Sequence, residues 1–236
     1  MDKNYFAVSL TQKHFEWHNE DAWSASEKMP IFAVADGVTM SPTDELAFPN
    51  GSKLAAGAFC RESMEVLEKG FDRLNRETIA AAYARANEEI KKVNAEYSAN
   101  FSTVASLAAV KDGKIYGSRL TDCGLGLVRN GEVIFKTPEF WSFQNERGRR
   151  GYGVLNGAMD VSEYIDHYEI PCELGDFLLL WSDGFENHFG IAEFISLFAP
   201  FDLDSLRDDI LKLDEKLVAQ DNEKFGHERT LLVVKL

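Results

Sequence analysis

Two stretches of the sequence run from a short apolar segment directly into a small residue, an aspartate and a glycine. The first is Ile31–Gly37 and the second is Phe177–Gly184. A short unbroken apolar run is typical of a strand buried on both faces, and a carboxylate is costly to desolvate without a partner. We therefore expect two core strands that deliver Asp36 and Asp183 to one cleft. Two carboxylates held close together either share a proton or hold a cation.

Length and composition favour one domain over residues 1–236. The chain is 45% hydrophobic, which is ample for a core, and no Pro/Gly/Ser linker or charge block divides it. The formal charge of -14 predicts a surface that repels nucleic acid and anionic membranes, because both bind to basic faces. Such a surface suits cations or basic protein partners.

The cysteines and the apolar runs indicate a cytoplasmic protein. Cys60, Cys123 and Cys172 are odd in number and form no CxxC motif, which is typical of a reducing compartment. We see no signal peptide at the N-terminus and no apolar run of transmembrane length.

The order of predicted elements indicates the α+β class, because strands and helices are segregated along the chain. Helical spacing predicts helices from Ser52, as N-cap, to Gly70 and from Asn75 to Tyr97, with two more near 191–197 and 206–217. Asp112-Gly113 and Asn130-Gly131 each separate two apolar runs and predict β-hairpins, because such turns need positive φ. The predicted strands are Tyr5–Leu10, the run ending at Asp36, Thr103–Val110, Lys114–Ser118, Leu125–Arg129, Glu132–Lys136, Tyr168–Ile170, the run from Phe177, and Thr230–Lys235.

Six segments together resemble the metal-dependent serine/threonine protein phosphatases of the PPM, or type-2C, family. They occur in the family's order and span nearly the whole chain. Singly each is a weak signal, since Asp-Gly often only begins a turn. The segments are Asn19–Ala22, Ala35–Gly37, Phe101–Val110, Leu120–Glu132, Gly175–Phe185 and Arg229–Val234.

The resemblance implies a four-layer αββα sandwich of two antiparallel sheets flanked by helices, with two Mn²⁺ or Mg²⁺ ions at one edge. It implies that Asp36 bridges both ions, that the Gly37 carbonyl binds one and that Asp183 binds the other. It also implies that Glu20 and Asp21 hold metal-bound waters, and that a water activated by the metals attacks the phosphate directly. The residue types fit, because hard cations prefer oxygen ligands.

Some positions depart from the family pattern. His227 stands three residues before Thr230, where the family has a metal-binding aspartate, and Glu228 is the alternative ligand in a shifted register. Asn187 replaces an aspartate and weakens a third site that Asp122 would share. Glu16 stands where the family has a phosphate-gripping arginine.

One basic cluster offers a replacement for that arginine. Arg147, Arg149 and Arg150 are either an ordinary solvated loop or a substrate-binding group, since guanidinium binds phosphate bidentately.

Two hypotheses follow for the function. The first is a phosphatase that hydrolyses phosphoserine and phosphothreonine in phosphoprotein substrates, with Asp36 and Asp183 as its catalytic residues. The alternative is a catalytically weak or inactive domain of the same fold that binds a protein partner. The departures at His227, Asn187 and Glu16 motivate this alternative.

Overall fold

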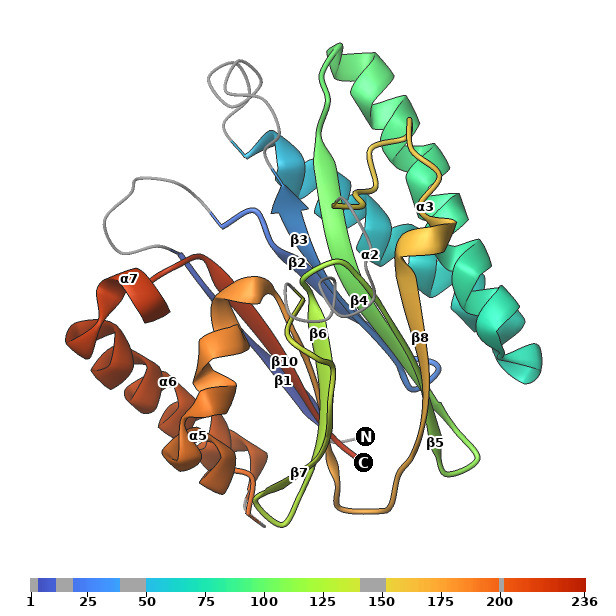
Figure 1. Ribbon diagram of the computed structural model, residues 1–236. Coiled ribbons are helices and arrows are strands. Elements are labelled where there is room, and N and C mark those ends of the chain that lie inside the picture. Colours follow the sequence, from blue (N-terminus) through green and yellow to red (C-terminus); the bar gives the residue numbers. More distant parts are fainter. Residues whose placement is uncertain (1–3, 12–18, 39–49, 141–151, 200–201) are drawn as a thin grey trace.

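The computed structural model describes residues 4–11, 19–38, 50–140, 152–199 and 202–236. Two antiparallel five-stranded sheets lie face to face, with helices on both outer faces (Figure 1). The predicted αββα sandwich is confirmed. Predictions for Arg147, Arg149, Arg150 and Glu16 fall outside the described residues.

Each sheet is built from strands distant in sequence. One sheet has the order β1-β10-β9-β6-β7, and the other has the order β2-β3-β4-β5-β8. The first comprises β1 (Tyr5–Leu10), β10 (Arg229–Lys235), β9 (Phe177–Trp181), β6 (Gly124–Arg129) and β7 (Glu132–Lys136). The second comprises β2 (Ala22–Ala25), β3 (Ile31–Val38), β4 (Ser102–Lys111), β5 (Lys114–Leu120) and β8 (Ile165–Pro171).

Helices α2 (Gly51–Gly70) and α3 (Arg76–Tyr97) cover the sheet that contains β3 (Figure 1). Helices α5 (Ala192–Ser196), α6 (Leu203–Gln220) and α7 (Asn222–Phe225) lie on the side of the other sheet, together with the 3₁₀ segment η3 (Asp183–Gly190). Shorter 3₁₀ turns are η1 (Phe71–Arg73) and η2 (Ser162–Tyr164). No helix within these described ranges is long and apolar enough to cross a membrane.

Central strands are apolar throughout because they are buried on both faces. In β9, Leu178 and Leu180 enter the core between the sheets, whereas Phe177, Leu179 and Trp181 pack against the helices. Successive side chains of a strand point to opposite faces, so one continuous apolar run fills two cores. The predicted buried strands at Ile31 and Phe177 have this character.

The two hairpins form where the sequence predicts them. Asp112 and Gly113 have φ of 52° and 73°, and Asn130 and Gly131 have φ of 51° and 76°. These left-handed pairs join β4 to β5 and β6 to β7. Positive φ at both central positions matches the twist of the flanking strands.

The start of α2 differs from the prediction. Asn50, in the left-handed conformation with φ 68°, precedes the helix, and Ser52 lies inside its first turn. The Ser52 hydroxyl donates to the carbonyl of Val38 at 2.9 Å, so it ties the helix to β3 and does not cap it. The sequence pattern also does not predict strand β2, because Ala22–Ala25 is short and mixes polar with apolar residues.

Gly124 provides a test of packing between β6 and β9. A Cβ at this position would lie 2.1 Å from the ring of Trp181, which is fully buried. We expect Gly124→Ala to lower the free energy of unfolding by about 1–3 kcal/mol, as overpacked cores do, measured by urea denaturation.

The matched control is Gly57→Ala on α2. Nothing lies within 4 Å of a Cβ built there, and alanine favours a helix over glycine by up to ~1 kcal/mol. This variant should be neutral or stabilised. Equal stability of the Gly124→Ala variant and the original chain would contradict the packing account.

Candidate metal centre

Three carboxylates from three separate segments meet at one end of the sandwich. One oxygen from each of Asp21, Asp36 and Glu228 lies within 4.8 Å of the others. Asp21 immediately precedes β2, Asp36 belongs to β3, and Glu228 immediately precedes β10. The cluster therefore joins elements of both sheets.

Strand register brings Asp21 beside Asp36. Strands β2 and β3 are antiparallel, and Ala22 of β2 pairs with Ala35 of β3. Asp21, which precedes Ala22, is therefore a neighbour of Asp36, which follows Ala35. The backbone N–H of Asp21 donates to Asn19 Oδ1 at 2.8 Å, and the hydroxyl of Ser182 donates to Asp21 Oδ2 at 2.8 Å. The first bond fixes the backbone at Asp21, and the second orients its carboxylate.

Gly37 follows Asp36 at a position where a larger residue has no room. A Cβ there would lie 2.8 Å from both the Cβ and the carbonyl oxygen of Glu20, and 2.9 Å from the backbone of Ser52. The Asp36 carbonyl accepts from the Thr103 hydroxyl at 2.6 Å. Glycine is therefore required by close approach of two other backbone segments.

The structure places Glu228, and not His227, in the carboxylate cluster. Glu228 Oε1 accepts the backbone N–H of Glu20 at 2.7 Å. The exposed His227 lies with its Nε2 atom 2.6 Å from the carbonyl of Glu223, although its charge still acts on Asp183. Between the two alternatives from the sequence, this geometry favours Glu228.

Strand alternation explains this outcome. Leu232 and Val234 of β10 face the core between the sheets, whereas Leu231 and Val233 face the helices. Side chains alternate with period two, so Glu228 falls on the inter-sheet side. On the other side, the Arg229 guanidinium donates to both carboxylate oxygens of the buried Asp214 at 2.7 and 2.6 Å.

Asp183 enters the same end of the sandwich from β9. It is exposed and begins η3, and its charge acts on Asp36. A Cβ on Gly184 would lie 2.1 Å from the carbonyl oxygen of Glu228. The glycine after Asp183 therefore lets the two acidic segments touch.

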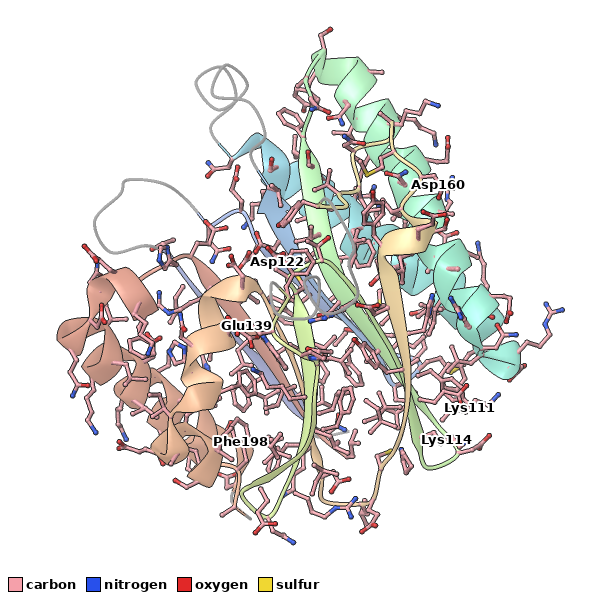
Figure 2. All side chains as sticks on the ribbon, viewed as in Figure 1. Lys111, Lys114, Asp122, Glu139, Asp160 and Phe198 are labelled. Atoms are coloured by element: carbon pink, nitrogen blue, oxygen red, sulfur yellow. The ribbon has the colours of Figure 1, made fainter. Side chains whose placement is uncertain are left out.

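Asp122 and Asn187, the two residues that the sequence analysis linked to a third metal site, each form a hydrogen bond. The Tyr152 hydroxyl donates to Asp122 Oδ2 at 2.7 Å, and Asp122 lies between the sheets, away from Lys111 and Lys114 at the opposite end (Figure 2). The amide of Asn187 donates to the carbonyl of Lys224 at 3.0 Å.

Burial raises the pKa values of these carboxyl groups, and the charges of neighbouring carboxylates add to the pKa shift at Asp36, Asp122 and Glu228. Burial raises the pKa of Asp21 and of Asp122 to about 6, and that of Glu228 to about 8. Desolvation, and then the charges of Asp21 and Asp183, raises the pKa of Asp36 well above its ordinary value of 3.8. Without a counter-cation, the group retains protons at neutral pH.

The donor set fits a hard divalent cation. Oδ1 of Asp21 is buried and has no hydrogen-bond partner among the described residues, which leaves a lone pair available at the centre of the cluster. All three clustered side chains are carboxylates, the ligands that Mg²⁺ and Mn²⁺ prefer.

Sequence reasoning offered Glu228 only as an alternative, and it missed Ser182 and Lys53. The Lys53 ammonium donates to the carbonyls of Asn19 and Asp21. Ser182 stands in the small-Asp-Gly motif, which is a weak signal. No local pattern marks Lys53, because its partners are 32 and 34 residues away.

Comparisons with known proteins point in one direction. A profile of the family described as protein phosphatase 2C matches residues 13–220. No curated protein matches the chain at a significant level.

Several solved structures share the fold. The catalytic domain of the serine/threonine phosphatase PstP, in complex with two manganese ions, has a TM-score of 0.71 and 19% identity, covering 98% of this chain and 96% of that chain. Stp1 from Staphylococcus aureus has a TM-score of 0.74 and 15% identity, covering 100% and 96%. MsPP from Mycobacterium smegmatis, in complex with cacodylate, has a TM-score of 0.69 and 17% identity, covering 98% and 97%.

The raised pKa values predict how pH affects the metal-free protein. Unfolded Asp and Glu titrate near 3.8 and 4.5, whereas folded Asp21 and Glu228 titrate near 6 and 8. The folded state thus binds more protons above pH 4.5, and stability falls as pH rises towards 8. One pKa unit for one group is worth ~1.4 kcal/mol, so we expect at least that loss between pH 5 and pH 8, measured by denaturation in EDTA.

Saturating Mn²⁺ provides the control. Ions that replace the protons relieve the repulsion, so Mn²⁺ should raise the melting temperature more at pH 8 than at pH 6. A metal-free protein that is equally stable at pH 5 and pH 8 would contradict the carboxylate crowding.

Proposed function

The chain belongs to the protein phosphatase 2C family, and we propose that Asp36, Gly37, Asp183 and Glu228 hold its two Mn²⁺ or Mg²⁺ ions. It is a metal-dependent serine/threonine phosphatase, a hydrolase that acts on phosphoproteins. The observation that carries the assignment of the site is the cluster of Asp21, Asp36 and Glu228 within 4.8 Å.

The ions supply what side chains alone lack: when bound, they lower the pKa of a water and offset the negative charge of the phosphoryl group. The chain supplies the geometry. The charges of Asp21 and Asp183 both act on Asp36, so Asp36 would hold the ions together with these neighbouring carboxylates. Glu20 and Asp21 flank this position and would hold the waters that complete the coordination.

Proton positions follow from the contacts. Asp21 Oδ2 accepts the Ser182 hydroxyl proton, and the Ser182 oxygen accepts the Thr230 N–H at 2.8 Å. The Ser182 bond uses Oδ2 and leaves Oδ1, which has no hydrogen-bond partner among the described residues, available to a cation. Tyr152 similarly orients Asp122 by donating to one of its oxygens.

Several finer features belong to the proposal. Arg147, Arg149 and Arg150 would bind the substrate phosphate, because guanidinium matches its geometry. Residues 1–236 would form a single phosphatase domain, since the family profile spans residues 13–220. The protein would act in the cytoplasm, because its three cysteines include no disulfide.

Removing the central carboxylate tests the function. We expect the unaltered chain to hydrolyse a phosphothreonine peptide and p-nitrophenyl phosphate only with added Mn²⁺ or Mg²⁺. Asp36→Asn should lower kcat/KM more than ~100-fold, beyond the 10–100-fold typical of residues that only support ligands. Asp208→Asn, an exposed substitution on α6, is the control and should keep full activity. Metal-independent turnover would refute the proposal.

A second pair of variants tests which residue before β10 binds metal. Glu228→Gln removes an anionic ligand from the cluster, and we expect at least ~10-fold weaker Mn²⁺ binding by calorimetry. His227→Gln changes a side chain that contacts the Glu223 carbonyl, so its effect should be less than about threefold. The reverse ranking would assign the ligand to His227.

A further inference from the structure

Lys53 contacts the metal centre from the first turn of α2. Its ammonium donates to the carbonyl oxygen of Asn19 at 2.6 Å and to that of Asp21 at 3.1 Å. These two carbonyls bracket the Glu20–Asp21 acid pair. The Lys53 ammonium therefore forms hydrogen bonds with the backbone at both ends of the short segment that carries Asp21.

The location is unusual for a cation. Lys53 is the third residue of a helix that begins at Gly51, and the positive end of the helix macrodipole opposes a positive side chain there. Within the described parts of the chain its ammonium has no carboxylate ion-pair partner, in contrast to Arg119, Arg129 and Arg229. Its two backbone contacts offset this unfavourable placement.

The rest of the turn is locked in place. The Ser52 hydroxyl bonds to the Val38 carbonyl, and a Cβ on Gly51 would lie 2.1 Å from the Phe101 ring. Ser52 thus fixes the turn to the end of β3, and Gly51 sets it against the start of β4. The backbone of Lys53 is therefore held in place, and its two hydrogen bonds fix residues 19–21 relative to α2.

We propose that Lys53 is a positioning residue of the divalent-cation site, which holds the backbone of residues 19–21 so that Asp21 stays within the carboxylate cluster. This inference rests on the proposed function of the cluster as a metal centre. Lys53 acts through the Asn19 and Asp21 carbonyls and is not itself a ligand.

The charge of Lys53 and its positioning role predict opposite effects on Mn²⁺ affinity when Lys53 is neutralised, which makes the proposal testable. A nearby ammonium repels a divalent cation, so if only its charge mattered, neutralising Lys53 would tighten Mn²⁺ binding. If Lys53 positions the acid pair, neutralising it loosens residues 19–21 and weakens binding.

The test is calorimetric titration of the whole chain with MnCl₂. We expect Lys53→Met to raise the Mn²⁺ Kd about 10–100-fold, the range for groups that orient metal ligands. Lys53→Arg keeps donors for the two carbonyls and should remain within a few-fold of the unaltered chain. Lys69→Met, on the last turn of the same helix and paired with Glu65, is the matched control and should not change the Kd.

Hydrogen exchange of the metal-free protein gives an independent readout. The N–H groups of Glu20 and Asp21 are hydrogen-bonded to Glu228 and Asn19, so they should exchange faster in Lys53→Met while α2 and α3 stay protected. Should this variant fail to fold, Lys53→Gln, whose amide is too short for both carbonyls, takes its place.

Two results would overturn the inference. One is Mn²⁺ binding by Lys53→Met that equals or exceeds that of the unaltered chain, and the other is Lys53→Arg as weak as Lys53→Met. Both leave the phosphatase assignment intact. Failure of the unaltered chain to bind Mn²⁺ would instead overturn the metal centre and the role of Lys53 with it.

Discussion

Repulsion among crowded, partly buried carboxylates is the constraint on which the candidate metal centre of this protein depends. One oxygen from each of Asp21, Asp36 and Glu228 lies within 4.8 Å of the others, and Asp183, at the start of η3, adds its charge. Such a group is unstable unless protons or cations occupy it and a rigid frame holds it. The frame is a sandwich whose central strands are buried on both faces, so that their ends have little freedom to move apart.

The same contacts that build the site also join the two sheets. Ser182, at the end of β9, bonds to Asp21 beside β2, and Glu228, before β10, accepts from Glu20. Each bond crosses from one sheet to the other. The site and this end of the sandwich are therefore interdependent, and metal binding should stiffen the contact between the sheets.

A buried ionic group supports the cluster from the helix side. Asp214 of α6 accepts two bonds from Arg229 and lies 3.0 Å from His188 Nε2, and Arg229 also donates to the His227 carbonyl at 2.6 Å. Separating Arg229 from Asp214 would leave an uncompensated buried charge. The pair therefore stays together and fixes the start of β10 on α6. Because Glu228 directly precedes Arg229, these contacts also orient Glu228.

The sequence by itself determined every strand except β2, the hairpin turns and the two Asp-Gly strand ends, because these follow from local periodicity and from the φ requirements of short turns. Only the tertiary structure places Glu228, and not His227, beside Asp21 and Asp36, and only it brings Lys53 to residues 19–21. Strand β10 is apolar on both faces, so its pattern does not reveal which face lies between the sheets. Lys53 and Ser182 meet the acid pair across 32 and 161 residues, a separation that only the folded chain closes.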